Sequence, residues 1–387
     1  MANFYTFFII QLEAKPIKIK ILFTIPNFDT AGSGKALLNI ATGLDREKFE
    51  PHIACLHNRG EFFKVVEESN IPIHIFNFMS PMKPRLKGLR GCFRIAKKLR
   101  EIAPQIIHSF NYSSDYSEAL SAKIARIPWI YTKKNMSWSG SSANAWRCRT
   151  FLATHIIAQN KDMINQFFIK KKNVTLVQRG INTNEFKKDD NSKIIRKELG
   201  ISKTKKILLT VANLAPVKGI EVLIHAFQKF IISNQQSYLI IVGDDKSEYA
   251  SYLKKVVKKH NLNGKVIFTG KRYDINSFYN AADIFVLPTL LIGEGCPVSL
   301  LEAMSTNTPV IASNVSGSRD ILENFQDWLF EPGNTKDLLK KIKTLFILNN
   351  DKMSTLGLVM RNHIKKNYDI KYEVIKTENI YEDIFHG

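Results

Sequence analysis

The sequence predicts an α/β protein made of two doubly wound, Rossmann-like domains that face each other across a cleft. Three observations support this fold class. The chain has 387 residues, and a single domain usually takes roughly 100–200. Short β-branched runs alternate with longer helical patterns, which is typical of parallel α/β layers. A polar, charged stretch at 182–200 interrupts this alternation and separates two such series.

The first series opens with the run KIKILFTI at 18–25, which predicts a strand. A glycine loop at 29–35 follows, and a helix is expected at 36–44. Further helices are expected at 86–102 and 115–125. Further strands are expected at 51–56, 72–78, 105–110, 129–134, 154–159 and 174–180.

The second series repeats the alternation after the polar stretch. Its strands are expected at 206–214, 238–245, 265–270, 283–289 and 309–313. Its helices are expected at 220–232, 249–260, 275–281, 298–305 and 336–348, with a helical tail at 371–385.

These two series define the domain organisation. We expect an N-terminal domain at 1–185, a linker at 186–202 and a C-terminal domain at 203–368. A C-terminal helix at 369–387 is expected to pack back on the N-terminal domain. Ligands of doubly wound sheets bind beyond the carboxyl ends of the strands, so the functional site is expected between the domains.

The composition narrows the class of protein. The formal net charge of +21 is compatible with nucleic acid, an anionic membrane or anionic substrates as partners. The four cysteines form no CxxC or Cys/His cluster, so we expect reduced thiols in a cytosolic protein and no metal site. No run supplies the roughly 18 apolar residues of a membrane span. The apolar run at 4–12 lacks the features of a signal peptide and is interpreted as an extension that packs on the protein or on a membrane.

The positive charge is concentrated between Lys83 and Arg149, where 14 Lys and Arg residues face three acidic residues. Within this region, the helix expected at 86–102 is amphipathic and basic, a pattern typical of binding to a membrane surface. Its apolar face could instead pack into the core, and we expect a mixture of the two. The residues of this face are Leu86, Leu89, Phe93, Ala96 and Leu99.

The glycine loop DTAGSGK does not fit the two common phosphate-binding patterns. Asp29 stands where a P-loop needs glycine, and Leu37 stands where a dinucleotide fingerprint needs a third small residue. Gly32 and Gly34 therefore indicate either a close approach of the backbone to a ligand or a plain tight turn.

The stretch EGCPVSLLEAM places Glu294 in a loop and Glu302 one turn inside a helix that begins near Pro297. One alternative is a capping box formed by Ser299 and Glu302. The other is a ligand site, because an anion at the free N–H groups of the helix start would lie between two carboxylates. Carboxylates accept hydrogen bonds from hydroxyl groups, so this arrangement predicts a nucleotide sugar as the ligand.

The stretch ANLAPVKG adds Lys218, in a loop that follows a strand. A lysine there is either solvated or bound to a phosphate as a point charge.

Together these stretches resemble the family 4 retaining glycosyltransferases, which have the GT-B fold. Glu294 and Glu302 match the E-x7-E signature of that family. Looser similarity covers the glycine loop, IIHSF and TKKN, which ends at Asn135. The longer matches are VANLAPVKGIEVLIHAF, YLIIVGDD, KVIFTGKRYDINSFYNAADIFVLPT and EGCPVSLLEAMSTNTPVIAS.

The resemblance implies roles for individual residues. Glu294 would hold the donor sugar, Glu302 the ribose hydroxyls, and Lys218 the diphosphate. His108 would line the donor-sugar pocket, which makes Glu294, His108 and Lys218 the expected catalytic residues. The other expected donor-binding residues are Gly32, Gly34, Gly295, Cys296, Pro297, Val298 and Ser299.

The resemblance also implies a reaction and a location. A hexosyl group would pass from a nucleotide-diphosphate sugar to a polysaccharide or lipid-linked acceptor in bacterial lipopolysaccharide or capsule synthesis. Neither a metal nor a cofactor would be needed. The enzyme would be cytoplasmic and peripheral on the inner face of the cell membrane, without nucleic acid as a partner.

One departure from the family pattern concerns the phosphate site. Asn213 stands where the family has an arginine, so a phosphate-binding cation is missing or comes from Arg179 or Arg319. Three other functions remain open: a nucleotide-sugar epimerase, a nucleic-acid-binding protein suggested by charge alone, and a non-catalytic partner that binds nucleotide sugars.

Overall fold

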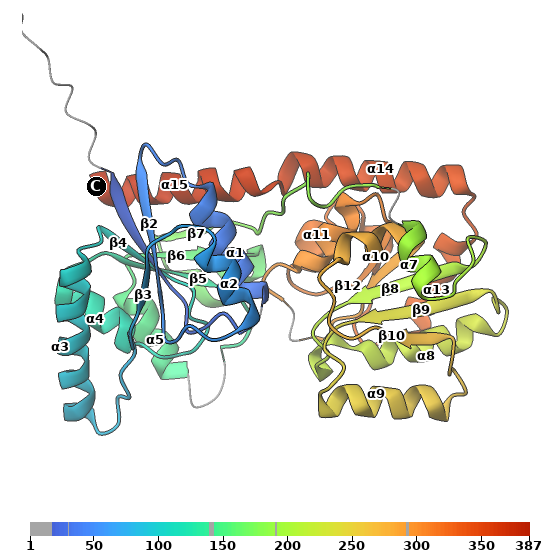
Figure 1. The fold of residues 1–387 in the computed structure, drawn as a ribbon, viewed down its shortest axis with the longest axis horizontal. Helices are drawn as coiled ribbons and strands as arrows, with labels where there is room; N and C mark the ends of the chain where they lie inside the picture. The colour runs from blue at the N-terminus through green and yellow to red at the C-terminus, as the bar shows by residue number, and fades with distance from the viewer. Residues whose placement is uncertain (1–17, 30, 139–142, 190–191, 292–293) are drawn as a thin grey trace, which may run out of the picture.

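The computed structural model describes residues 18–29, 31–138, 143–189, 192–291 and 294–387. It consists of two domains side by side, with two consecutive C-terminal helices running along both (Figure 1). The apolar extension expected at 4–12 lies outside the described residues.

The N-terminal domain has a parallel seven-stranded sheet in the order β3-β2-β1-β4-β5-β6-β7. Its strands are β1 Ile19–Thr24, β2 Phe49–Cys55, β3 Ile73–Ile75, β4 Ile106–Ser109, β5 Trp129–Lys133, β6 His155–Ala158 and β7 Val174–Leu176. Its helices are α1 Ala31–Gly43, α2 Glu61–Glu67, α3 Arg85–Ile102, α4 Ser117–Ala125, α5 Ala143–Leu152 and α6 Lys161–Met163, which continues as the π-helix η2 Ile164–Phe168.

The C-terminal domain has a parallel six-stranded sheet in the order β10-β9-β8-β11-β12-β13. Its strands are β8 Lys206–Val211, β9 Ser237–Val242, β10 Val266–Phe268, β11 Ile284–Leu287, β12 Val310–Ser313 and β13 Leu329–Phe330. Its helical elements are α7 Ser192–Glu198, η3 Pro216–Lys218, α8 Ile220–Ile231, α9 Glu248–Lys259, α10 Ile275–Ala281, α11 Val298–Ser305, α12 Ser318–Ile321, η4 Gln326–Trp328, α13 Thr335–Phe346 and α14 Asn350–Asn367. The chain ends with α15 Ile370–His386.

Both sheets are buried on their two faces, which explains their nearly continuous apolar strands. In the N-terminal domain, one core cluster lies under α1, α2 and α15, and another lies under α3, α4 and α5. The C-terminal domain has the same two-sided arrangement. The predicted pair of doubly wound domains is therefore confirmed, while α14 is a helix that the sequence analysis did not assign.

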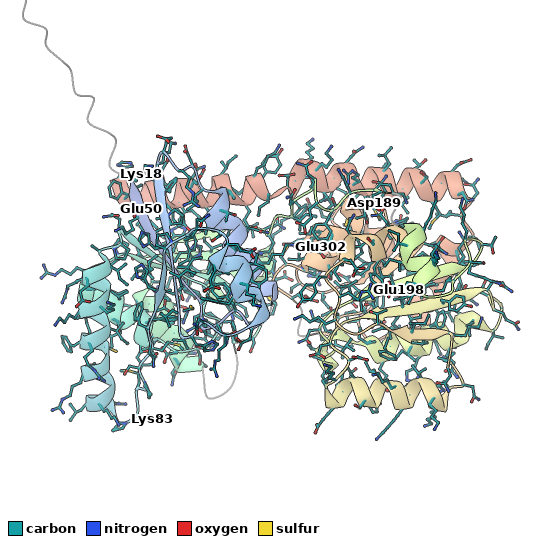
Figure 2. The ribbon with its side chains drawn as sticks, in the orientation of Figure 1. Lys18, Glu50, Lys83, Asp189, Glu198 and Glu302 are labelled. Carbon is teal, nitrogen blue, oxygen red and sulfur yellow. The ribbon has the colours of Figure 1, made fainter. Side chains whose placement is uncertain are left out.

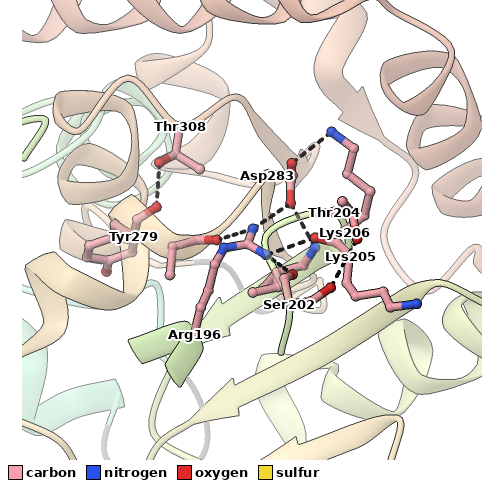
Figure 3. A network of polar contacts seen from close by, with 10 residues as sticks. Arg196, Ser202, Thr204, Lys205, Lys206, Tyr279, Asp283 and Thr308 are labelled. Atoms are coloured by element: carbon pink, nitrogen blue, oxygen red, sulfur yellow. Dashed lines mark hydrogen bonds and ion pairs between the residues drawn. The ribbon is translucent and has the colours of Figure 1, made fainter. Parts of the chain in front are cut away.

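A polar network fastens α7 to the C-terminal sheet (Figure 3). Arg196 donates to the carbonyl of Ala281 at 2.8 Å and to Asp283 Oδ2 at 3.2 Å. The other oxygen of Asp283 pairs with Lys206 Nζ at 2.9 Å. This short helix therefore belongs structurally to the domain that follows it.

The last helix, α15, packs on the N-terminal domain. Arg179, which follows β7, donates to Glu373 Oε1 at 2.7 Å, and both side chains are buried. The backbone N–H of Gly180 donates to the other oxygen of Glu373 at 2.7 Å. A carboxylate that accepts both bonds satisfies its buried charge, so this contact ties the end of the chain to β7.

The amphipathic helix α3 divides its apolar residues between core and surface. Ala96 and Leu99 are buried against the sheet. Leu86 is 78% exposed and Phe93 is 60% exposed, and Leu89 also lies at the surface. The core-packing part of the expectation for α3 is thus present, and Leu86, Leu89 and Phe93 are exposed on the same helix, while membrane binding stays a prediction. Among the helices in the described part of the chain, none combines the length and hydropathy needed to cross a bilayer.

The anchoring of α15 makes a prediction about stability. Glu373→Ala is expected to lower the free energy of unfolding by about 3–5 kcal/mol, because it leaves Arg179 buried without its counter-charge. Urea denaturation followed by tryptophan fluorescence measures this loss. Glu382→Ala on the same helix is the control, because its pair with Lys48 lies at the surface and contributes little. Equal losses in the two variants would contradict the prediction.

Candidate functional site

The centre of the site is an ion pair between the loops that follow β8 and β11. Lys218 Nζ lies 2.7 Å from Glu294 Oε2, and both side chains are about one-fifth exposed. The other carboxylate oxygen of Glu294 accepts a hydrogen bond of 2.6 Å from the hydroxyl of Thr289. The pair is therefore fixed at the carboxyl ends of two neighbouring strands, as expected for a doubly wound sheet.

The backbone of these loops explains why the two side chains meet. Gly219 has a φ of +62°, and a Cβ built on it would lie 2.0 Å from the carbonyl oxygen of Pro288. Only glycine combines this left-handed conformation with such close packing. The N–H of Leu290 also donates to the carbonyl of Val217 at 2.8 Å, which joins the two loops directly.

Helix α11 begins at Val298, with Pro297 as its N-cap and without a side-chain cap. The first N–H groups of a helix have no partner inside it, so those of Val298 and Ser299 are available to an anion. The structure contradicts the capping-box alternative, because Ser299 is not the N-cap residue and Glu302 instead accepts a hydrogen bond of 2.8 Å from the Tyr279 hydroxyl.

Glu302 lies on α11 at the side of the C-terminal domain that is turned toward the N-terminal domain (Figure 2). Burial raises its pKa to about 7, while the Tyr279 hydrogen bond and the positive charge of Lys35 oppose this rise. Lys35 belongs to α1 of the other domain and pairs with Glu185 at 2.8 Å. The first turns of α1 therefore face the carboxylate of α11.

The glycine loop differs from its expected form. Helix α1 already begins at Ala31, so Gly32 and Gly34 lie in its first turn and not in a loop. A Cβ on Gly34 would lie 2.8 Å from the ring of Phe28, so this glycine is required by packing inside the domain. A Cβ on Gly32 would meet nothing within 4 Å, so only this position leaves room for a ligand.

The proposed pocket role of His108 is wrong. Its side chain is fully buried in the N-terminal core. One ring nitrogen contacts the Tyr381 hydroxyl at 2.6 Å, and the other contacts the Thr132 hydroxyl at 2.8 Å. Burial also lowers its pKa well below the usual range. His108 is therefore a neutral core residue that joins β4 to β5 and α15.

The candidate replacements for the missing phosphate-binding arginine are already paired. Arg179 is held by Glu373, as described above. Arg319 pairs with Asp162 of the N-terminal domain at 2.9 Å, which makes it a contact between the domains. Asn213 itself is exposed.

Asn135 and Cys296, two other expected site residues, differ in their surroundings. Asn135 accepts a hydrogen bond of 2.7 Å from Lys133, so its amide oxygen is used inside the N-terminal domain. Cys296 is half-buried, and burial raises the pKa of its thiol to about 12, which keeps the thiol protonated and unreactive. Within the described ranges, no three His, Cys, Asp or Glu side chains converge as a possible metal site.

The N-terminal domain reaches this site through residues that the sequence analysis did not select. A Cβ on Gly295 would lie 2.3 Å from the carbonyl oxygen of Lys134 and 2.7 Å from Gln159 Oε1. Asn160 donates hydrogen bonds to the carbonyls of Glu294 and Gly295. Gln159 and Asn160 are single polar residues after a strand and belong to no recognisable sequence motif. The sequence alone therefore could not predict their contact with the loop of Glu294.

Comparison with known proteins identifies related sequences. The family model described as glycosyl transferases group 1 matches 191–366, and the model described as glycosyltransferase family 4 matches 30–185. The chain is 26% identical over 322 residues to UDP-Gal:alpha-D-GlcNAc-diphosphoundecaprenol alpha-1,3-galactosyltransferase of Escherichia coli, covering 77% of this chain and 80% of that protein. It is 24% identical over 307 residues to N,N'-diacetylbacillosaminyl-diphospho-undecaprenol alpha-1,3-N-acetylgalactosaminyltransferase of Campylobacter jejuni, covering 74% of this chain and 79% of that protein.

Solved structures agree with the fold. A glycosyltransferase from Rickettsia africae superposes with a TM-score of 0.83 at 20% identity, covering 95% of this chain and 98% of that one. Anabaena HepE in complex with UDP-glucose superposes with a TM-score of 0.80 at 21% identity, covering 94% of this chain and all of that one. At such identities the likeness shows the fold alone.

The raised pKa of Glu302 predicts a pH-dependent stability. Its carboxyl group is protonated more readily in the folded state, so its stabilising contribution is complete below pH 4.5 and is lost as the pH rises through about 7. We expect the stability of the wild-type protein relative to Glu302→Gln to fall by about 1–3 kcal/mol between pH 4.5 and pH 8. Urea denaturation of both proteins at each pH measures this, and parallel pH profiles would disprove it.

Proposed function

The chain is a member of the family 4 glycosyltransferases, and we propose that it is a retaining hexosyltransferase that uses a nucleotide-diphosphate sugar as donor. The acceptor is a lipid-linked oligosaccharide or polysaccharide of the bacterial cell surface. One observation carries this proposal: Lys218, in the loop after β8, pairs with Glu294, in the loop that leads into α11. The first N–H groups of α11 and Glu302 complete a site for a phosphate flanked by hydroxyl groups.

The donor binds at this site by replacing the ion pair that Lys218 and Glu294 form with each other. Its diphosphate takes Lys218 from Glu294 and accepts hydrogen bonds from the N–H groups of Val298 and Ser299. Glu294 is then available to the hydroxyls of the donor sugar. Glu302, already in contact with the Tyr279 hydroxyl, accepts from the ribose hydroxyls.

The chemistry requires stabilisation of a leaving group. The bond between the anomeric carbon and the diphosphate oxygen breaks, the acceptor oxygen bonds to that carbon, and the proton of the acceptor hydroxyl passes to a phosphate oxygen of the leaving nucleoside diphosphate. Negative charge develops on the nucleoside diphosphate, and preorganised donors at that position lower the barrier. Lys218 and the start of α11 supply this positive potential, so we expect turnover without an added metal. Domain closure excludes water from the reacting carbon and limits hydrolysis.

The proposed acceptor follows from the relatives. Both curated relatives named above carry undecaprenol diphosphate in the names of their acceptors. Another relative is the putative teichuronic acid biosynthesis glycosyltransferase of Bacillus subtilis, 26% identical over 256 residues, which cover 63% of this chain and 62% of that protein. A lipid-linked substrate lies at a membrane, so an enzyme acting on it must reach the bilayer surface.

Helix α3 provides a surface suited to the inner, anionic face of that membrane. Leu86, Leu89 and Phe93 are exposed along it, and they are surrounded by basic side chains. Apolar side chains enter the interface while Lys and Arg are attracted to anionic lipids. The basic residues of α3 are Arg85, Lys87, Arg90, Arg94, Lys97, Lys98 and Arg100.

Replacing the central acid tests the proposed reaction. A thermal-shift panel of nucleotide sugars, beginning with UDP-galactose, identifies the donor by the rise in melting temperature. With that donor, Glu294→Ala is expected to lower turnover by about 100-fold or more while leaving the unfolded fraction unchanged. Asp351→Ala, an exposed acid on α14, is the control and should keep wild-type turnover. Normal turnover in Glu294→Ala would refute the site.

Vesicle sedimentation tests the membrane surface. The protein is expected to bind vesicles containing phosphatidylglycerol at low salt, and to bind less at high salt because the attraction is screened. Replacing Leu86 and Phe93 with Ser should weaken binding about tenfold or more, since it removes the inserted apolar groups. Ile232→Ser on the C-terminal domain, which removes a side chain that is 74% exposed, is the matched control. Equal binding by all three proteins would contradict this role of α3.

A further inference from the structure

Asn160 lies between the two domains without any exposure to solvent. It follows β6, and its amide oxygen accepts a 2.7 Å hydrogen bond from the N–H of Met163, which caps α6. Its amide nitrogen donates to the carbonyl of Glu294 at 2.9 Å and to the carbonyl of Gly295 at 2.8 Å. A single side chain of the N-terminal domain therefore holds the backbone of the loop that carries Glu294.

The same loop is confined on two further sides. The carbonyl of Lys134 and the side chain of Gln159 leave no room for a Cβ on Gly295, as described above. From the C-terminal domain, Gly317 has a φ of +80°, and a Cβ on it would lie 2.7 Å from the carbonyl oxygen of Gly295. The loop thus runs between the ends of β5 and β6 on one side and the start of α12 on the other.

We infer that Asn160 is a positioning residue that couples the approach of the two domains to the placement of the Glu294 carboxylate. Both carbonyls that it holds belong to the segment 294–295 just before α11, so their position sets the direction of Glu294. When the domains separate, both hydrogen bonds break and this segment loses its support from the N-terminal domain. The inference deepens the proposed function and rests on it for the role of Glu294.

Two neighbouring ion pairs between the domains are more exposed than the hydrogen bonds of Asn160, whereas the backbone N–H of Lys161 donates to the buried carboxylate of Asp320 at 2.8 Å. Lys161 pairs with Glu323 at 2.8 Å, and Asp162 pairs with Arg319 at 2.9 Å, and these pairs are largely exposed. Exposed ion pairs are screened by salt and contribute little. The bonds of Asn160 are buried, where unpaired carbonyl groups are costly, so they control the geometry of the loop.

Two substitutions separate the donor function of Asn160 from its capping function. Asn160→Asp and Asn160→Ser both keep an oxygen that caps α6, and neither has the amide donor that reaches the two carbonyls. Asn173→Asp is the matched control. Asn173 also donates to two backbone carbonyls, those of Ala153 and Thr154, but both lie in its own domain.

Hydrogen exchange measured by mass spectrometry reports the loop directly. Peptides covering 294–299 are expected to exchange at least tenfold faster in both Asn160 variants than in the wild-type protein, and at the wild-type rate in Asn173→Asp. Unchanged exchange in the Asn160 variants would overturn the inference. This readout needs neither donor nor acceptor, so it remains decisive even if the wild-type protein transfers no sugar and the proposed function fails.

Kinetics and binding test the positioning role. With the donor found in the thermal-shift panel, Asn160→Asp should lower kcat at least tenfold, whereas Asn173→Asp should keep the wild-type kcat. The affinity for that intact donor, measured by calorimetry, should change on Asn160→Asp in the wild-type background and stay constant in the Glu294→Ala background, because Glu294 contacts the donor sugar and the effect passes through it. Faster loop exchange with wild-type kcat, or an equal affinity change in both backgrounds, would refute positioning.

Discussion

The contact between Lys218 and Glu294 is the constraint on which the site depends. It exists because Gly219 allows the loop after β8 to lie directly against the backbone that follows β11. Parallel strands end at the same edge of a sheet, so two loops far apart in sequence meet there. In the absence of a ligand the two charges neutralise each other. The diphosphate of the proposed donor would replace Glu294 as the partner of Lys218, while sugar hydroxyls become the hydrogen-bond partners of Glu294, so neither side chain would be left unpaired in a partly buried place.

The two domains are held by different kinds of contact at their two sides. Away from the site, α15 attaches the end of the chain to β7 through the buried pair of Arg179 and Glu373. At the site, the loop of Glu294 is confined by Asn160 and by the backbone at Lys134. A buried ion pair between α15 and the N-terminal domain, combined with a few hydrogen bonds between the domains at the site, suits a hinge-like motion. In such a motion the site would be completed when the domains approach.

The sequence was sufficient for the fold and for part of the site. Alternating apolar runs and helical patterns predicted both sheets. The sequence also predicted that Glu294 lies in a loop and Glu302 in the helix that follows it, because both belong to one short continuous segment of the chain. The role of His108 was not predictable in the same way, because Tyr381 covers it from the far end of the chain. Nor was Asn160, since its partners are backbone carbonyls of the other domain and carry no side-chain signal. Local order is encoded locally, whereas burial and contacts between domains are decided by the tertiary fold.

The phosphate site alone does not account for the positive charge of the chain, because the basic residues near the site are already paired with carboxylates. Near the junction of the domains the cations are matched: Lys218 by Glu294, Arg179 by Glu373, and Arg319 by Asp162. On α3, by contrast, Lys98 is the one basic residue that pairs with a carboxylate within the described chain, through Glu101. Positive charge without a carboxylate partner therefore gathers on α3, on which Leu86, Leu89 and Phe93 are also exposed. A nucleotide carries too few charges and too little apolar surface to cover such a helix, whereas the anionic bilayer that we propose as its partner offers both along its whole length.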